Sequence, residues 1–242
     1  MLGLSFNAAV GHAGLLILLT ASAVGALSTG YAIVTNNRVA LRQSLTYAWL
    51  ILIGALVSVF AMQRALQVRD YSLEYVQDVG SSTTPTLYNV AAMWSALEGS
   101  ILLWVLVLAI FTAAVAWRFR KRIDDALVGW ALVVMFVVSG FFGLVSFGPA
   151  NPFAAGPPVP FGFDGPGPNP LLQNHILVLF HPPILYLGYV GFTVPFAFAI
   201  AALITGRVGE GWLMETRRWA LFSWGFLTIG ILLGGWWSYE VL

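Results

Sequence analysis

The sequence predicts an all-α, polytopic membrane protein, and three observations lead to this fold class. Apolar residues make up 59% of the 242 positions and charged residues only 9%, whereas a soluble domain carries roughly 25% charged residues. The mean hydropathy is +0.85. Six apolar runs are each long enough to cross about 30 Å of hydrocarbon as a helix, which takes roughly 20 residues. We therefore expect about six transmembrane helices within one membrane domain spanning residues 1–242.

The six apolar runs are continuous rather than alternating, so helices are expected and a β-barrel is not. They cover residues 8–34, 44–63, 91–117, 126–147, 183–205 and 219–237. Two long connections, 64–90 and 148–182, join the second run to the third and the fourth to the fifth. We interpret the first of these as a connector whose tyrosines lie at the membrane interface. The second is crowded with proline and glycine, which exclude regular structure but stiffen the chain. Within the fifth run we expect a bend at Pro195.

Basic residues are concentrated in alternate connections. Nine of the 11 Lys and Arg residues lie between the first and second, third and fourth, and fifth and sixth runs. The opposite connections hold only Arg64 and Arg69, beside several carboxylates. The positive-inside rule therefore places the N-terminus, both long connections and His181 on the extracytoplasmic side. The chain has no cysteine, which excludes disulfides and thiolate metal sites, and no nucleic-acid partner is expected.

Two ionisable residues lie near the predicted outer ends of helices. His12, in the first run, is interpreted as a hydrogen-bonded bystander rather than a ligand. Glu98 follows Trp94 at the entry of the third run. A carboxylate there is a functional candidate by default, but a shallow position favouring the helix N-terminus explains it equally well. Both interpretations of Glu98 stay open.

His181 lies where the proline- and glycine-rich connection meets the fifth apolar run. A residue before proline is disfavoured in the helical conformation, and proline is tolerated in the first turn of a helix. We therefore expect the helix to start at Pro182 and Pro183, with His181 immediately before its first turn. An imidazole fixed in this way suits a metal ligand or a proton carrier. The preceding stretch 171–180 is compatible with a short helix on the membrane surface, and His175 within it with a surface residue.

Trp236 and Trp237 lie at the outer end of the sixth run. Aromatic residues there are typical of an interfacial belt. Adjacent tryptophans followed by tyrosine could equally line a binding site for a flat aromatic ligand.

Four segments together resemble the CcmF family of cytochrome c-type biogenesis proteins, haem-handling membrane proteins marked by a tryptophan-rich box. These segments are 94–104 (WSALEGSILLW), 169–173 (NPLLQ), 180–192 (FHPPILYLGYVGF) and 234–242 (GGWWSYEVL). Only the lead-in to the tryptophan-rich box lies within this chain. We therefore expect the chain to be the N-terminal part of a longer protein.

The resemblance implies a haem lyase of cytochrome c maturation in the bacterial inner membrane. In this family, haem brought by the chaperone CcmE is joined through its vinyl groups to the two cysteines of a Cys-x-x-Cys-His apocytochrome c, with a CcmH-type protein handling the apocytochrome. His181 matches the first of two outer histidines that ligate the iron, and imidazole is a common axial ligand. Trp236 and Trp237 are placed to contact the haem. The second outer histidine and both ligands of a structural b-type haem are expected beyond residue 242.

A polytopic transporter or proton-channel subunit is the alternative from a different class, with Glu98 and His181 in a conduction path. Transporters typically show ionisable residues deep in helices, broken helices in paired halves, or internal repeats. Here we find one shallow carboxylate and no convincing repeat. A structural scaffold leaves the His-Pro-Pro segment unexplained. Relatives that carry haem across the membrane or present it to a different lyase share the tryptophan-rich box, and the extent of the match favours the lyase over them.

Overall fold

The computed structural model describes residues 5–170, 175–207, 209 and 211–241. Six helical units in these ranges are long and apolar enough to cross a membrane, which confirms the predicted all-α architecture. They are α1 (Phe6–Val34), α2 (Arg38–Val68), α5 (Leu97–Phe119) with the 3₁₀ turn η2 (Arg120–Arg122), α6 (Ala126–Phe147), α8 (Leu177–Gly191) followed by α9 (Thr193–Thr205), and α10 (Gly211–Val241).

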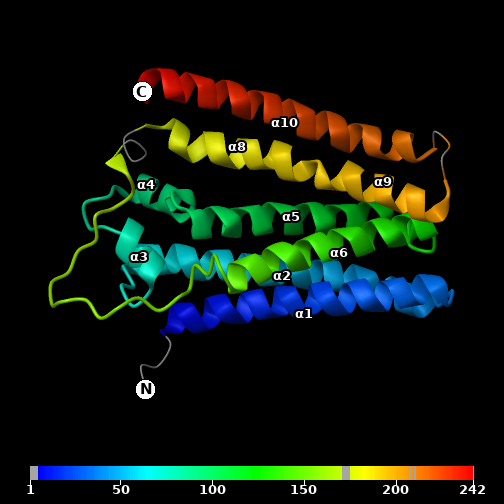
Figure 1. Cartoon of the computed structure of the whole chain (residues 1–242), viewed down its shortest axis with the longest axis horizontal. Coiled ribbons are helices and arrows are strands. Elements are labelled where there is room, and N and C mark those ends of the chain that lie inside the picture. The colour runs from blue at the N-terminus through cyan, green and yellow to red at the C-terminus, as the bar shows by residue number, and fades with distance from the viewer. Residues whose placement is uncertain (1–4, 171–174, 208, 210, 242) are drawn as a thin grey trace.

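The long helices lie roughly side by side (Figure 1). The α1–α2 pair forms one edge, α5 and α6 occupy the middle, and α8–α9 and then α10 form the other edge. Helix α10 packs mainly on α8 and, among the described residues, leaves much of its surface uncovered. The start of α1, the end of α10 and the described parts of the two long connections lie at the same end of the array. We call this the outer end and the opposite one, which carries most Lys and Arg, the basic end.

Close packing of α1 against α2 depends on two glycines. A Cβ atom on Gly14 would lie 2.7 Å from the carbonyl oxygen of Gly54, and one on Gly54 would lie 2.6 Å from that of Gly14. Small residues of this kind let helix backbones approach where lipid supplies no hydrophobic driving force. Ser58 adds a hydrogen bond from its hydroxyl to the Gly11 carbonyl across the same interface.

Four helix starts differ from the sequence prediction by several residues. Helix α2 starts at Arg38 and α10 at Gly211, so arginines assigned to connections belong to helices. The third spanning helix starts at Leu97 rather than at 91, because the preceding residues form α4 (Thr86–Ala91) and the 3₁₀ turn η1 (Ala92–Trp94). The fifth starts at Leu177 instead of at the proline pair, which lies inside α8.

The fifth span is interrupted at Phe192, the residue between α8 and α9, three residues before the bend expected at Pro195. Pro195 has no amide hydrogen to donate to the Gly191 carbonyl four residues earlier, so the helical ladder breaks there. Of the expected surface helix 171–180, residues 171–174 lie outside the described part of the chain. Residues 177–180 form the first turn of α8.

The two outer connections fold together into a cap, which we define as residues 69–96 and 148–170. The amide of Glu74 donates to the Ala154 carbonyl (3.0 Å), and that of Gly156 donates to the Ser72 carbonyl (2.9 Å). Segment 64–90 is therefore more ordered than a simple connector, and it includes α3 (Glu74–Val79). Tyr75, expected at the membrane interface, is only 4% exposed.

Asp164 fastens the Pro- and Gly-rich connection to the other half of the cap. Its carboxylate accepts hydrogen bonds from the hydroxyl (2.5 Å) and amide (2.9 Å) of Ser82 and from the hydroxyl of Tyr71 (2.6 Å). These bonds, those from the Ser82 hydroxyl and then Tyr71 contributing most, lower the pKa of Asp164 to about 2.

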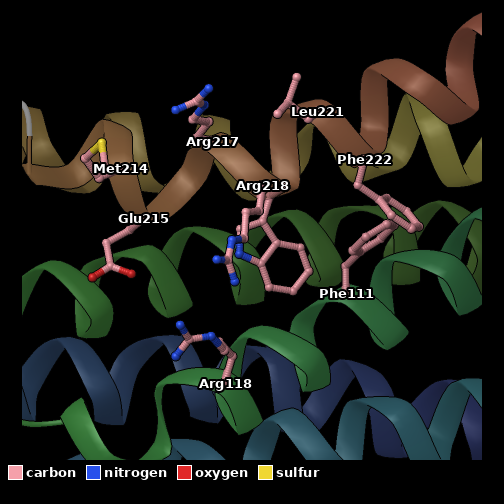
Figure 2. A pocket seen from close by; sticks show the side chains of 9 residues that line it. Phe111, Arg118, Met214, Glu215, Arg217, Arg218, Leu221 and Phe222 are labelled. Atoms are coloured by element: carbon pink, nitrogen blue, oxygen red, sulfur yellow. The ribbon is translucent and has the colours of Figure 1, made fainter.

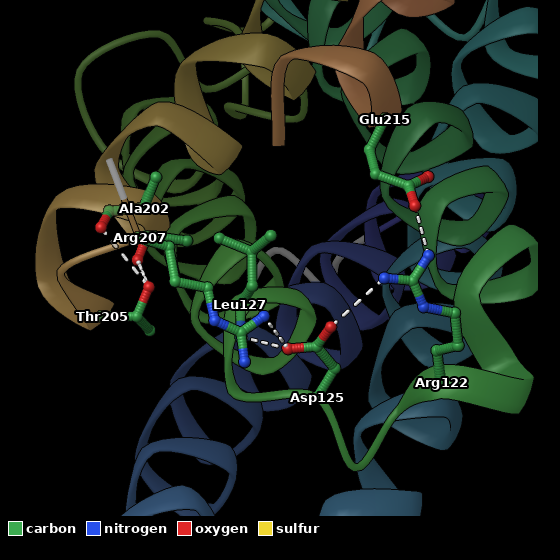
Figure 3. Close-up of polar contacts among 8 residues, drawn as sticks. Arg122, Asp125, Leu127, Ala202, Thr205, Arg207 and Glu215 are labelled. Carbon is green, nitrogen blue, oxygen red and sulfur yellow. Dashed lines mark hydrogen bonds and ion pairs between the residues drawn. The ribbon is translucent and has the colours of Figure 1, made fainter. Parts of the chain in front are cut away.

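At the basic end, Asp125 joins three segments (Figure 3). Its carboxylate caps α6 by accepting a hydrogen bond from the amide of Leu127 (3.1 Å). It also accepts from Arg207, after α9 (2.6 Å), and from Arg122 of η2 (3.3 Å). Arg122 in turn pairs with Glu215 of α10, so the ends of α6, α9 and α10 are linked through one small network.

Candidate functional site

His181 lies within α8, four residues after the helix begins, with its ring half-buried against α10. This corrects the prediction that His181 precedes the first turn of the helix. Its Nδ1 atom is 2.8 Å from the carbonyl oxygen of Gly230. Because a carbonyl can only accept, Nδ1 carries the proton and Nε2 keeps its lone pair. No described residue hydrogen-bonds Nε2, so its lone pair is not taken up by the described part of the chain.

Helix α8 approaches α10 closely beside His181 because glycines line the contact. A Cβ atom on Gly188 would lie 2.2 Å from the backbone nitrogen of Leu227, and one on Gly230 would lie 2.8 Å from the Cα atom of Leu185. At Gly234 a Cβ atom would lie 2.6 Å from Cε1 of His181 itself. The His181 ring thus occupies space that only glycine leaves open.

Trp237 lies beside both His175 and His181. Its ring centroid is 5.7 Å from that of His181, at an interplanar angle of 62°, and 6.5 Å from that of His175, nearly parallel at 18°. Its indole N–H is buried and has no hydrogen-bond partner among the described residues. The structure therefore brings two sequence-predicted residues, His181 and Trp237, together.

Trp236 points elsewhere, as adjacent residues of a helix must. Its side chain is 56% exposed, and its indole nitrogen donates to Oε1 of Glu240 at 2.5 Å. The second oxygen of Glu240 is 2.5 Å from Nε2 of His175. His175 also accepts a hydrogen bond at Nδ1 from the amide of Leu177, which begins α8. The sequence analysis did not predict that His175 and Glu240 pair beside Trp237, because residues 65 positions apart give no local sequence signal.

The other ionisable candidates lie apart from this cluster. His12 contacts the Ala8 carbonyl through Nδ1 (2.9 Å) and the Asn151 side chain through Nε2 (3.2 Å), on α1 at the far edge of the array. Glu98 is in the first turn of α5, where its partly exposed carboxylate lines a cap cavity of about 170 Å³ with Glu74 and Asp78. Trp94 does connect to α8, since its indole nitrogen donates to the Val178 carbonyl at 2.8 Å.

A separate cavity of about 760 Å³ lies between α5 and α10 near the basic end (Figure 2). In this view Arg118 rises from α5 toward Arg218 on α10, beside Phe111 and Phe222. The carboxylate on its wall, Glu215, is already bound to Arg122. Since its arginines lie near the opposite end of the helices from His181, this cavity is not part of the candidate site.

The chemistry available at the outer end is that of a single imidazole ligand beside an aromatic wall. Among the described residues, no three His, Cys, Asp or Glu side chains converge as a metal site. His181 can offer one nitrogen to a metal that brings its other ligands with it, as haem iron does. Its bond to Gly230 is the support typical of metal-binding histidines, whose other nitrogen donates to a carbonyl or carboxylate.

The description "Cytochrome C assembly protein" belongs to the family that matches residues 94–242. "Cytochrome c-type biogenesis protein CcmF" of Haemophilus influenzae is 43% identical over 175 residues, 72% of this chain and 26% of that protein. CcmF of Escherichia coli is 43% identical over 196 residues, 81% and 30% of the two chains. A solved structure described as "Cytochrome c Heme Lyase CcmF" superposes with a TM-score of 0.84 at 35% identity, covering 96% of this chain and 36% of that one. The chain thus spans about a quarter to a third of the length of the curated relatives it matches.

Proposed function

The chain belongs to the cytochrome c assembly protein family, and we propose that it forms the haem-holding part of a cytochrome c haem lyase. In this proposal, haem is the substrate and is held at the outer end of the helices. The lyase joins it to the cysteines of a Cys-x-x-Cys-His apocytochrome c. The relatives' names support this function, because both CcmF and a haem lyase structure are similar to the chain.

The observation that carries the proposal is the state of His181. Its Nδ1 proton is committed to the Gly230 carbonyl, so the free Nε2 is directed by a fixed ring and is ready to bind iron. Trp237, in contact with the same ring, would support one side of the imidazole and offer a flat apolar surface. Trp236 is exposed on the same helical turn and is the weaker contact candidate.

Thioether formation needs positioning more than acid–base power. A cysteine thiol adds across a haem vinyl group: its sulfur bonds to one vinyl carbon and its hydrogen is transferred to the other, with no net oxidation or reduction. Residues of this chain would hold the iron through His181 so that the vinyl edge is presented to the incoming cysteines. Fixing two reactants in this way supplies much of the acceleration that a bimolecular addition requires.

The proposal also assigns sides and partners. The basic end lies in the cytoplasm and the cap on the extracytoplasmic face of a bacterial inner membrane, following the charge asymmetry. Haem would reach His181 from the chaperone CcmE, and a CcmH-type protein would handle the apocytochrome. A second axial histidine and the ligands of a structural b-type haem are assigned to the part of the protein beyond residue 242.

The test is haem capture by the full-length protein, purified in detergent and followed by its visible absorption spectrum. We expect His181→Ala to reduce capture of haem from the chaperone and to leave any buried b-type haem in place. The matched control is His12→Ala, which removes a histidine that has its own partners at the far edge of the helix array.

Wild-type capture by the His181→Ala variant would overturn the assignment of His181. If the unmodified protein captures no haem in either redox state, the haem lyase proposal fails and the transporter alternative takes its place.

A further inference from the structure

Pro182 leaves a backbone carbonyl of α8 without its usual donor. In an α-helix the amide of residue 182 would donate to the carbonyl of residue 178, and proline has no amide hydrogen. Val178 is only 3% exposed, so water has little access to compensate. A buried carbonyl needs a partner, because leaving it unpaired is unfavourable.

Trp94 supplies the missing donor from another part of the chain. Its indole nitrogen lies 2.8 Å from the Val178 oxygen, across 84 residues of sequence. Indole N–H can only donate, so the direction of this bond is fixed. The bond offsets the donor lost at Pro182, and the helix runs on through His181 and both prolines.

The turn that carries Trp94 is itself held from two sides. The hydroxyl of Tyr75 lies 2.8 Å from the carbonyl oxygens of both Ala92 and Met93, which precede Trp94 in η1. Burial raises the pKa of Tyr75, which keeps this hydroxyl protonated. On the other side, a Cβ atom on Gly99 would lie 1.7 Å from the Met93 oxygen, so glycine there lets the turn sit directly on α5.

We propose that Trp94 is a positioning residue for His181. Its indole N–H replaces the amide that Pro182 lacks, holds the first turn of α8 in register, and so keeps His181 aligned with the Gly230 carbonyl. The inference rests on the proposed function, in which His181 ligates haem. It makes segments 94–104 and 180–192 one structural unit, although they are far apart in sequence.

The test is a double-mutant cycle in the full-length protein, with the affinity for added haem measured by spectroscopic titration and the His181→Ala background subtracted. Trp94→Phe removes the N–H and keeps an aromatic ring. Loss of this support for a ligating histidine predicts a roughly tenfold weaker affinity, the lower end of the effect typical of such supporting partners. Pro182→Ala restores the amide donor. In that background Trp94→Phe should weaken the affinity by less than about twofold, because the two donors substitute for each other.

Trp104→Phe is the matched control, because the Trp104 indole N–H is buried without a hydrogen-bond partner among the described residues. All titrations are made well below the thermal midpoint of each variant, so that a merely unfolded protein is not mistaken for a misaligned ligand. The alignment of His181 is then read from the haem spectrum, which a change in overall stability does not alter.

Equal losses in Trp94→Phe and Trp104→Phe would overturn the inference, as would a Trp94→Phe loss that Pro182→Ala does not reduce. Both results leave the His181 assignment standing, since His181→Ala still abolishes the signal. If His181→Ala binds haem as the unmodified protein does, the proposed function and the inference fail together. The inference is supported if Trp94→Phe weakens haem binding when residue 182 is proline but not in the Pro182→Ala variant.

Discussion

An alanine at position 234 would place a methyl group in the space that the His181 ring occupies. The added Cβ atom would lie 2.6 Å from Cε1, 3.2 Å from Nδ1 and 3.3 Å from Nε2 of that ring. Ordinary contact begins near 3.4 Å, so the ring must retreat by roughly 0.8 Å. A side-chain ring can rotate away from such a clash more easily than a backbone can. We therefore expect the helices to stay packed and the histidine to move.

The main consequence is a displaced ligand nitrogen, and the cost to the fold is partly offset by the helix propensity of alanine. Displacing the ring breaks the bond from Nδ1 to the Gly230 carbonyl, worth about 0.5–1.5 kcal/mol, and an off-rotamer side chain costs a similar amount. Together these predict about 10- to 100-fold weaker haem binding, the range typical when the support of a ligating histidine is lost. Helix propensity favours alanine over glycine by up to about 1 kcal/mol, so thermal stability should change little.

Gly235→Ala is the matched control, because a Cβ atom there meets nothing within 4 Å. Both variants would be compared by spectroscopic haem titration and by thermal unfolding in detergent. We expect Gly234→Ala alone to lose haem affinity while both keep the unmodified thermal midpoint within a few degrees. If the two variants bind haem equally well, the geometry inferred for His181 and α10 is wrong. If Gly234→Ala instead unfolds the protein, the expected retreat of the ring is wrong.

Three further predictions concern the cap, the basic end and the α1–α2 interface. The pKa of Asp164 is lowered to about 2, chiefly by the Ser82 hydroxyl, so its contribution to cap stability is present at neutral pH and is lost as the pH falls from about 3.8 through about 2. Limited pepsin digestion across this range should show a step that Asp164→Asn lacks. Asp125→Ala should destabilise the protein by about 1–2 kcal/mol through loss of the α6 cap and two exposed ion pairs. Asp125→Asn, which can still cap, should lose less in the same unfolding assay. Gly54→Ala should cost about 1–3 kcal/mol because its Cβ meets backbone, whereas Gly30→Ala, which meets nothing within 4 Å, should be neutral in thermal unfolding.

The sequence predicted the membrane spans well because the thickness of the hydrocarbon layer sets their length. A helix must be about 20 apolar residues long to cross the hydrocarbon layer, and such runs are visible without knowledge of any contact. Helix ends were less predictable. The turn that precedes Leu97 packs on Gly99 of α5, and the amide of Leu177, the first residue of α8, donates to Nδ1 of His175.

Some residues of the candidate site were likewise predicted from the sequence, and others were identified only from the structure. His181 and Trp237 were selected from the sequence, and the structure brings them into contact. His175 and Glu240 join them through contacts between segments far apart in the chain. Trp94 had no assignable role until its bond to Val178 was known.

By itself, the sequence determined that this chain is helical and suited to span a membrane, and it placed the candidate site residues at one end, because composition and charge act through the surrounding lipid and water. Only the tertiary structure decided which nitrogen of His181 is free and which donor replaces the amide that Pro182 lacks. Both depend on a single donor or acceptor, the Trp94 indole and the Gly230 carbonyl, supplied by neighbouring elements. Local rules consider only the donors within a segment, and here the decisive partners came from outside it.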